Sequence, residues 1–193
     1  VVPQEARLMP ALLDPRPLSA DEKTRLRVTY EAGLLKTLRA GVNADLASEL
    51  GTVLERVAQS PEGLGHYSFW RAAAAVFQVV AESSLAVDLY VKRLVARLNA
   101  QLKETLAGGR TINEALYREV LFSLAMARNC SDRVEPVRNA FLLEGSIPED
   151  FENSRFGLYD ADAERCATEV IPAIKEAWDL VSQKKHGAIQ QFL

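Results

Sequence analysis

The fold class follows from residues 64–83, LGHYSFWRAAAAVFQVVAES. Wound into a helix, this stretch carries apolar side chains nearly all the way round, from Tyr67 and Phe69 through the alanines at 72–75 to Val80. A helix that is apolar on every side must be buried on every side. The four alanines would also let neighbouring helices approach closely. The stretch is therefore predicted to be the central helix of a helical bundle.

An amphipathic helix is expected before this core, starting near Ser19. Ser19 can accept a free backbone N–H at the helix start while Glu22 reaches back, which is the capping-box arrangement. Gly41 supplies a stop signal. The inward face is predicted from apolar residues at helical spacing: Leu26, Tyr30, Leu34, Leu35 and Leu38.

A second helix is expected between that segment and the central one. Asn43 can cap its start, and Ser60-Pro61-Glu62-Gly63 carries the turn residues that would end it. Its predicted inward face consists of Leu46, Leu50, Val53, Leu54 and Val57.

Three further helical segments follow the central stretch. Residues 85–106 are predicted to form a long amphipathic helix that ends at Gly108-Gly109, and the run from Thr111 to Glu114 predicts a second capping box. Ser131 opens a shorter segment that Gly145 closes. The three predicted inward faces are Val87, Val91, Leu94, Leu98 and Leu102; Ile112, Leu116, Val120, Leu121 and Leu124; and Val134, Val137, Phe141 and Leu142.

Four ranges make up the predicted organisation of the chain. Residues 1–17 are a Pro-rich lead-in, 18–145 the helical bundle, 146–160 an ordered linker and 161–193 a C-terminal helix. No window alternates in the way a strand requires. The predicted fold class is therefore all-α, an antiparallel bundle of six to seven helices with a C-terminal extension helix. Because the chain begins at Val1 without Met, we expect it to be a piece of a longer protein.

Composition excludes several classes of function. The chain of 193 residues has 48% hydrophobic and 25% charged residues and a net charge of -3, which argues against a nucleic-acid binder. No apolar run approaches the roughly 20 residues that a membrane span needs. Cys130 and Cys166 are the only cysteines, which fits a reducing, cytoplasmic setting better than a disulfide framework.

Candidate catalytic residues are scarce. The chain has two histidines: His66, near the start of the central helix, and His186, near the end of the chain. Neither has metal ligands at a suitable spacing, Gly108-Gly109-Arg110 lacks the Lys and Ser/Thr of a phosphate loop, and no GxSxG is present. We therefore expect no enzyme activity, no metal and no cofactor, with His66 as the single candidate for chemistry.

Three stretches and a shorter run carry a resemblance to a known family. They are residues 26–36, LRVTYEAGLLK; residues 66–74, HYSFWRAAA; residues 89–94, LYVKRL; and residues 119–125, EVLFSLA. Residues 18–145 resemble the N-terminal helical segments of PilL/ChpA-type hybrid histidine kinases, CheA-like proteins of the type IV pilus (twitching) chemosensory system. The related scaffold protein FimL carries similar segments.

The resemblance implies a histidine-phosphotransfer (Hpt)-like bundle that has lost its chemistry. An active Hpt domain presents its phosphate-accepting histidine in an H-x-x-K-G setting on an exposed helix face. Here Phe69 and Trp70 stand at the third and fourth places after His66, and Ile189 and Gln190 at those places after His186. Phosphate acceptance is therefore not carried over to either histidine.

The implied function is a non-catalytic scaffold or docking module of a chemotaxis-type histidine kinase that controls twitching motility. Its partners would be neighbouring Hpt-like repeats, response regulators or pilus-system scaffold proteins. Residues 168–193 look like the opening helix of the next repeat, which should pack less completely than the body or form a homodimer with another copy.

Two alternatives stay open at this point. One is active phosphotransfer through His66, which would need this residue exposed in mid-helix with a basic residue one turn away. The other is a small-molecule sensor with a pocket around Trp70 and Phe77, because helical bundles can hold such sites between their helices.

Overall fold

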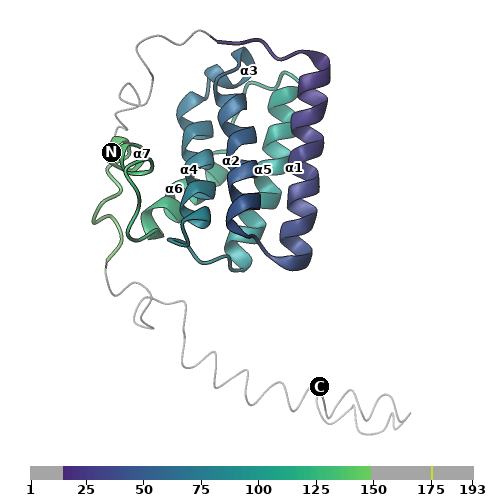
Figure 1. Ribbon diagram of the computed structural model, residues 1–193. Coiled ribbons are helices and arrows are strands. Elements are labelled where there is room, and N and C mark those ends of the chain that lie inside the picture. The colour runs from purple at the N-terminus through teal and green to yellow at the C-terminus, as the bar shows by residue number, and fades with distance from the viewer. Residues whose placement is uncertain (1–14, 149–174, 176–193) are drawn as a thin grey trace, which may run out of the picture. The chain divides into compact units, whose positions relative to one another are not determined.

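The computed structural model describes residues 15–148 together with Lys175 (Figure 1). The chain divides into two compact units, Val1–Ile147 and Pro148–Leu193, and the account below concerns the first. Within residues 15–148 no strand occurs, and seven helices follow one another: α1 (Ala20–Ala40), α2 (Ala44–Ala58), α3 (Pro61–Leu64), α4 (Tyr67–Ala81), α5 (Leu89–Leu106), α6 (Glu114–Met126) and α7 (Glu135–Ala140).

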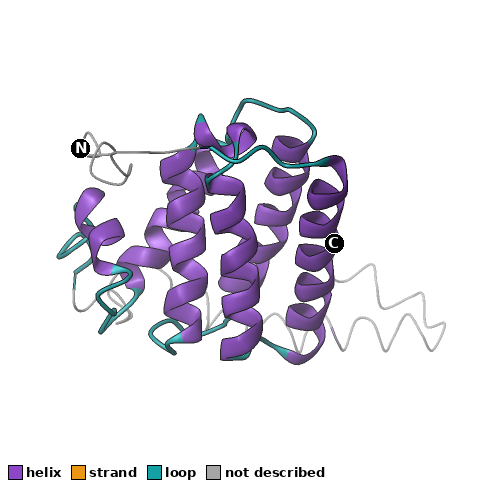
Figure 2. Ribbon diagram, turned by 45° about the horizontal axis from the view of Figure 1, so that its top comes forward, coloured by secondary structure: helices purple, strands orange, loops and turns teal. Residues whose placement is uncertain are grey.

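The described unit is an all-α bundle, as the sequence predicted. Helices α1, α2, α4 and α5 stand side by side, and α6 and α7 lie on the side of α4 away from α1 (Figures 1 and 2). Helix α4 packs most extensively on α2 and also contacts α6, α3 and α7. Eleven of its 15 residues are buried. The apolar stretch is therefore the centre of the fold.

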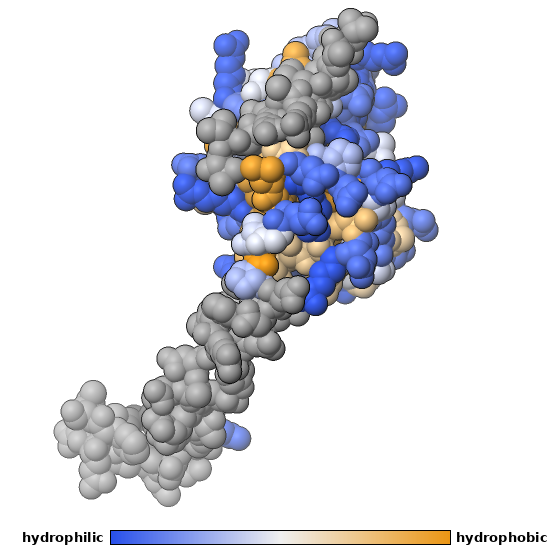
Figure 3. All heavy atoms as spheres, turned by 90° about the vertical axis from the view of Figure 1, so that its left-hand side faces the viewer, coloured by the Kyte–Doolittle hydropathy of each residue, from blue (hydrophilic) through white to orange (hydrophobic). Residues whose placement is uncertain are grey.

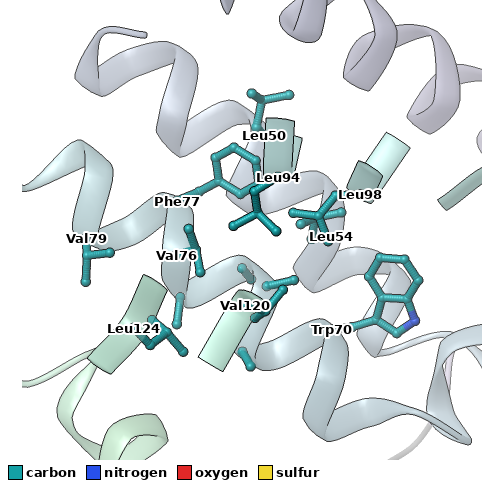
Figure 4. Close-up of a cluster of buried hydrophobic side chains, with 14 of the residues drawn as sticks. Leu50, Leu54, Trp70, Val76, Phe77, Val79, Leu94, Leu98, Val120 and Leu124 are labelled. Atoms are coloured by element: carbon teal, nitrogen blue, oxygen red, sulfur yellow. The ribbon is translucent and has the colours of Figure 1, made fainter. Parts of the chain in front are cut away.

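Side chains from four helices meet around α4 (Figure 4). Phe77 lies 1% exposed in this cluster and makes an edge-to-face contact with Tyr30 of α1, with ring centroids 6.1 Å apart. Such ring pairs stabilise a core by about 0.5–1.5 kcal/mol beyond the area they bury. The cluster shown comprises Leu50, Leu54, Trp70, Val76, Phe77, Val79, Leu94, Leu98, Val120 and Leu124.

The predicted central helix at 64–83 is confirmed as α4 over Tyr67–Ala81, but the turn expected before it forms a separate short helix, α3. Ser60 does not simply end α2; its hydroxyl accepts a hydrogen bond from the N–H of Gly63 at 3.2 Å and so caps the start of α3. Helix α3 ends at Leu64, and the chain bends through Gly65 and His66 before α4 begins. A single turn of helix therefore precedes the buried one.

The inward face of α1 is confirmed in part, since Tyr30 is buried and Leu26 and Leu34 pack against the core. Leu35 and Leu38 are 53% and 49% exposed, whereas the buried residues of α1 are Tyr30, Gly33 and Thr37. The hydroxyl of Thr37 donates to the carbonyl of Gly33 at 2.9 Å, so burying this polar side chain leaves no unmade hydrogen bond. Leucines on several sides of α1 made its orientation ambiguous from spacing alone.

Two helix starts lie later than predicted. Helix α6 is capped by Asn113, whose side-chain oxygen accepts from the N–H of Leu116 at 3.0 Å, so Thr111 is not its N-cap. Helix α5 begins at Leu89 rather than at residue 85, because the side chain of Asp88 accepts from the N–H of Val91 at 2.9 Å. In both places the helix begins directly after the side chain that caps it, Asn113 for α6 and Asp88 for α5.

The chain after α7 also departs from the predicted pattern. Leu142 has a positive φ of 53° and is 53% exposed, while Leu143 is 9% exposed and joins the core. The N–H of Leu143 bonds to the carbonyl of Arg138 at 3.0 Å, which closes the end of α7. A left-handed residue at a helix end reverses the chain direction, so the inward position moved by one residue.

The described end of the lead-in, residues 15–17, is attached to the bundle through Arg56 of α2. Its side chain donates to Glu22 at 2.7 Å and to the backbone carbonyl of Arg16 at 3.2 Å. Hydrophilic side chains cover most of the face shown in Figure 3, with apolar atoms in small patches between them. The predicted linker at 146–160 lies outside the described residues apart from its start, as do residues 1–14 and the predicted helix at 161–193 apart from Lys175.

Candidate functional site

His66, the single candidate for chemistry, lies at the start of α4. It occupies the N-cap position with φ −134° and ψ 36°, and its side chain makes no capping hydrogen bond. Instead its ring nitrogen Nε2 lies 2.7 Å from the carbonyl oxygen of Arg110. A carbonyl only accepts, so Nε2 carries the proton and donates it. His66 therefore links the start of α4 to the connection between α5 and α6.

This position differs from what phosphotransfer requires. His66 is partly buried and precedes the helix instead of projecting from its middle. The nearest basic residue along the helix, Arg71, forms an ion pair with Glu55 at 2.5 Å. Neither the exposed mid-helix position nor a free cation one turn away is present at His66. His186 and Cys166 lie outside the described residues.

The aromatic residues proposed as a pocket lie in packed core. Trp70 is 0% exposed and stacks edge-to-face on Phe69, with centroids 4.8 Å apart. Figure 4 shows Trp70 and Phe77 among the core side chains, and neither residue lines either of the two cavities described below. Within the described ranges, no group of three His, Cys, Asp or Glu side chains could hold a metal ion.

A polar cluster joins the end of α4 to the connection before α7. One carboxylate oxygen of Glu82 accepts from the hydroxyl of Ser131 and from the side-chain amide of Gln78, both at 2.6 Å. Burial raises the pKa of Glu82, but the hydrogen bonds from Ser131 and Gln78 outweigh it, so the pKa lies below the ordinary value. The cluster holds two elements together and leaves the carboxylate charged.

The first cavity, of about 550 Å³, lies between α2, α4 and the connection before α7. Small residues such as Ala47, Gly51 and Ala74 line its base, and the ion pair of Glu55 with Arg71 lies at its edge. Its lining carries two basic residues, Arg71 and Arg133, and two acidic ones, Glu55 and Asp132, so these charges cancel and favour neither an anion nor a cation.

The second cavity, of about 430 Å³, is a groove between α5 and α6. Tyr90 and Phe122 lie on its two sides, 67% and 47% exposed. Arg93, Arg97 and Arg118 also line the groove. Exposed aromatic rings beside arginines are the side-chain combination most enriched at the centres of protein–protein interfaces.

Buried Gln101 holds the two sides of this groove in place. Its amide nitrogen donates to the carbonyl of Thr111 at 2.9 Å, and its amide oxygen accepts from the N–H of Asn113 at 3.0 Å. Gln101 is 4% exposed, so these bonds are shielded from water. The connection between α5 and α6 is thus attached to α5 just before α6 begins.

A comparison with protein families supplies the identification. Residues 17–154 match the family model described as FimL scaffold protein second domain. The chain belongs to this family. No curated protein and no solved structure gave a significant match.

Membership in the FimL scaffold family agrees with the FimL part of the sequence resemblance. The matched range, 17–154, covers all seven described helices and the lead-in at Pro17 that Arg56 binds. The likeness to PilL/ChpA-type kinases and the Hpt-like assignment stay predictions. Across the described residues, no helix is both long enough and apolar enough to cross a lipid bilayer.

Sequence reasoning did not identify the α5–α6 groove. The signal was present, since Tyr90, Arg93 and Arg97 lie outside the inward stripe of α5, and Arg118 and Phe122 outside that of α6. Exposed residues of these types on a single helix do not by themselves indicate a binding site, however. Only the packing of α6 beside α5 brings the two outward sets together.

Proposed function

We propose that this chain is a non-catalytic scaffold module that binds other proteins in the cytoplasmic signalling assembly controlling type IV pilus (twitching) motility. The observation that carries the proposal is the match of residues 17–154 to the second domain of the FimL scaffold protein. A scaffold acts by presenting surfaces, which a rigid helical core with charged outer faces provides.

The degenerate Hpt-like character is part of the same proposal. An Hpt-like bundle without an accepting histidine keeps the architecture of a phosphotransfer domain and uses it for docking. The hydrogen bond of His66 to Arg110 supports a structural role for this histidine. The partners of such a module would be response regulators, neighbouring Hpt-like repeats or other scaffold proteins of the pilus system.

The segment at 161–193 belongs to the proposal as the opening of a further repeat or as a homodimer contact. Light scattering of the full chain and of a version ending at residue 148 tests this. If the helix pairs two copies, the full chain will have twice the mass of its monomer and the shortened chain will not. Equal monomeric masses would remove the homodimer from the proposal.

Two variants separate scaffolding from phosphotransfer in the bacterium that carries the protein. An in-frame deletion of residues 17–154 should abolish twitching and release the other proteins that co-purify with the protein. His66→Gln should leave both unchanged, because glutamine keeps a side-chain N–H donor for the carbonyl of Arg110 but cannot accept phosphate.

A phosphorylation assay tests the alternative directly. The purified chain is incubated with a cognate phosphorylated response regulator, beside an active Hpt domain as a positive control. We expect the control to take acid-labile label and this chain to take none. Label that appears on the chain and disappears in His66→Gln, together with loss of twitching in that variant, would establish phosphotransfer and overturn the scaffold proposal.

A further inference from the structure

The groove between α5 and α6 has a composition that selects its occupant. We define the α5–α6 groove by its lining residues Tyr90, Arg93 and Arg97 of α5 and Arg118, Glu119 and Phe122 of α6. Three arginines and one glutamate give this lining a net charge of plus two, whereas the whole chain has a net charge of -3. The groove is thus a basic site on an acidic chain.

Two of the three arginines are oriented by ion pairs. Arg97 reaches across from α5 to Glu119 of α6, and Arg118 pairs with Glu114 one turn earlier on its own helix at 2.5 Å. Arg93 has no ion-pair partner among the described residues. Of the three guanidinium groups that line the groove, only that of Arg93 has no carboxylate partner among the described residues, so it is the one that would pair with a carboxylate from outside.

Apolar surface beside these charges adds a second requirement. Leu89 and Tyr90 at the start of α5 are 69% and 67% exposed, and Phe122 on the facing helix is 47% exposed. Leu94, 2% exposed, contributes to the base of the groove. Covering this surface would release water from large apolar side chains, each of which stabilises a complex by about 1 kcal/mol or more when fully buried.

From this combination we propose that the α5–α6 groove binds an acidic amphipathic segment of another protein. An apolar side chain of the segment would lie between Tyr90 and Phe122, and an Asp or Glu of the segment would pair with Arg93. Arginine is suited to this because its planar fork can bind a carboxylate with two parallel hydrogen bonds. The inference rests on the proposed scaffold function and specifies one of its binding surfaces.

A second copy of this chain does not fit the groove. A two-fold contact places the same patch on both partners, so Arg93 would face arginines of the other copy. The other exposed apolar strip, Val28, Leu35 and Leu38 on α1, is flanked by Arg27, Lys36 and Arg39, so it is also basic. The carboxylates on these two surfaces are already paired, Glu119 with Arg97, Glu114 with Arg118 and Glu31 with Lys103. Neither contact between copies therefore offers an unpaired carboxylate to Arg93.

A nucleic acid fits less well than an acidic protein segment. Glu119 lines the groove, and Glu114 lies beside it in the pair with Arg118, so two carboxylates would repel a phosphate backbone. A peptide carboxylate meets the same repulsion at only one or two points and gains the apolar contact with Tyr90. The charge pattern therefore favours a protein partner.

The test measures peptide binding to the full 193-residue chain by fluorescence anisotropy. The probe is a labelled helical peptide with Leu and Trp at i, i+4 and i+7 and Glu at the flanking positions. Reference probes are the same peptide with Lys in place of Glu, and a labelled single-stranded oligonucleotide. We expect the acidic peptide alone to bind, and to bind more weakly as salt is raised.

Two matched double variants locate the binding site. Tyr90→Ala/Arg93→Glu should weaken binding of the acidic peptide by about tenfold or more, as loss of a central interface residue does. Leu35→Ala/Arg39→Glu on α1 makes the same change in charge and removes a comparable exposed side chain, and it should leave binding unchanged. Circular dichroism of both variants confirms that the helices are retained.

The proposal is wrong if the lysine peptide or the oligonucleotide binds better than the acidic peptide, if nothing binds, or if both double variants bind like the wild type.

In the bacterium, Tyr90→Ala/Arg93→Glu should lose one co-purifying protein and keep the rest. An unchanged set of co-purifying proteins would overturn the groove while leaving scaffolding intact. Failure of the 17–154 deletion to release any of them would instead overturn the proposed function.

Discussion

Two glycines in one turn show how strongly the structure depends on single residues. A Cβ on Gly63 would lie 2.0 Å from the carbonyl oxygen of Val57 and 2.7 Å from its carbon, both backbone atoms that cannot move aside. A Cβ on Gly65, two residues later, would have nothing within 4 Å. The end of α2 and the start of α3 can therefore come together only where residue 63 has no side chain.

Alanine at these two positions should have opposite consequences. Gly63→Ala should lower the free energy of unfolding by at least about 2 kcal/mol, because the new methyl group forces α3 away from α2. Gly65→Ala should change it by less than about 0.5 kcal/mol, since its backbone is already right-handed at φ −59°. Urea denaturation followed by circular dichroism measures both. Equal effects at the two sites would show that the close contact at Gly63 does not constrain the fold.

Tyr30 tests a buried hydrogen bond at the same scale. Its hydroxyl donates to the carbonyl of Val95 at 3.2 Å in a fully buried position, and burial raises the pKa of Tyr30 well above its ordinary value. Tyr30→Phe should cost about 1 kcal/mol, the net worth of one hydrogen bond, because the ring contact with Phe77 is retained. Tyr30→Ala should cost about 3 kcal/mol or more. If Tyr30→Phe proved neutral, the hydroxyl would contribute nothing to joining α1 and α5.

At the scale of elements, the start of α6 depends on one side chain. Asn113 accepts the N–H of Leu116, while the Thr111 hydroxyl has only a 3.4 Å contact with Glu104. We expect Asn113→Ala to lower the free energy of unfolding by about 1 kcal/mol, the usual cost of losing an N-cap. Thr111→Ala is the matched control and should be within about 0.5 kcal/mol of wild type. Chemical denaturation of both variants distinguishes the two positions, and a larger effect at Thr111 would reverse the assignment of the cap.

The contact between α4 and the connection before α7 should depend on pH. The pKa of Glu82 is lower in the folded chain than its ordinary value of 4.5, so the contribution of Glu82 to stability is complete above that value. It is lost as the pH falls through the folded pKa. The difference in unfolding free energy between wild type and Glu82→Gln should therefore shrink when the pH is lowered from 7 to below 4.5. A difference that stays constant would mean that the charge of Glu82 is not what Ser131 recognises.

At the scale of the whole molecule, the described unit has a core of its own. The cluster of buried side chains draws on six helices of residues 15–148, from Tyr30 on α1 to Val137 on α7. A unit with a continuous core of this kind is expected to unfold in one cooperative step.

Residues 15–148 produced alone should therefore fold. We expect one sharp thermal transition, with a midpoint within about 4 °C of that of the full chain, a change that corresponds to roughly 1 kcal/mol. Differential scanning calorimetry of the two versions provides the comparison. A broad transition, or one lowered by far more than this, would show that the rest of the chain completes the core.

The central helix and the inward face of α2 could be predicted from the sequence because buried positions of a helix are apolar and recur at helical spacing. An all-round apolar run has a single stable place, inside the bundle, and all five residues predicted for the inward face of α2 are buried. The caps at Ser19 and Asn43 could also be predicted, because each side chain accepts a hydrogen bond from the backbone N–H only three residues later.

Tertiary structure decided what local patterns leave open. Leu35 and Tyr30 are both apolar at helical spacing, but in the bundle Tyr30 is buried against Phe77, Gly33 lies close to Leu50, and Leu35 is left exposed. The α5–α6 groove arose in the same way, since Arg93 and Phe122 are unremarkable until their helices pack together. Hydrophobic burial is non-directional, so a sequence indicates which residues favour the interior but not which of them pack there. The packing of the assembled helices decides which apolar residues are buried and which exposed residues become neighbours.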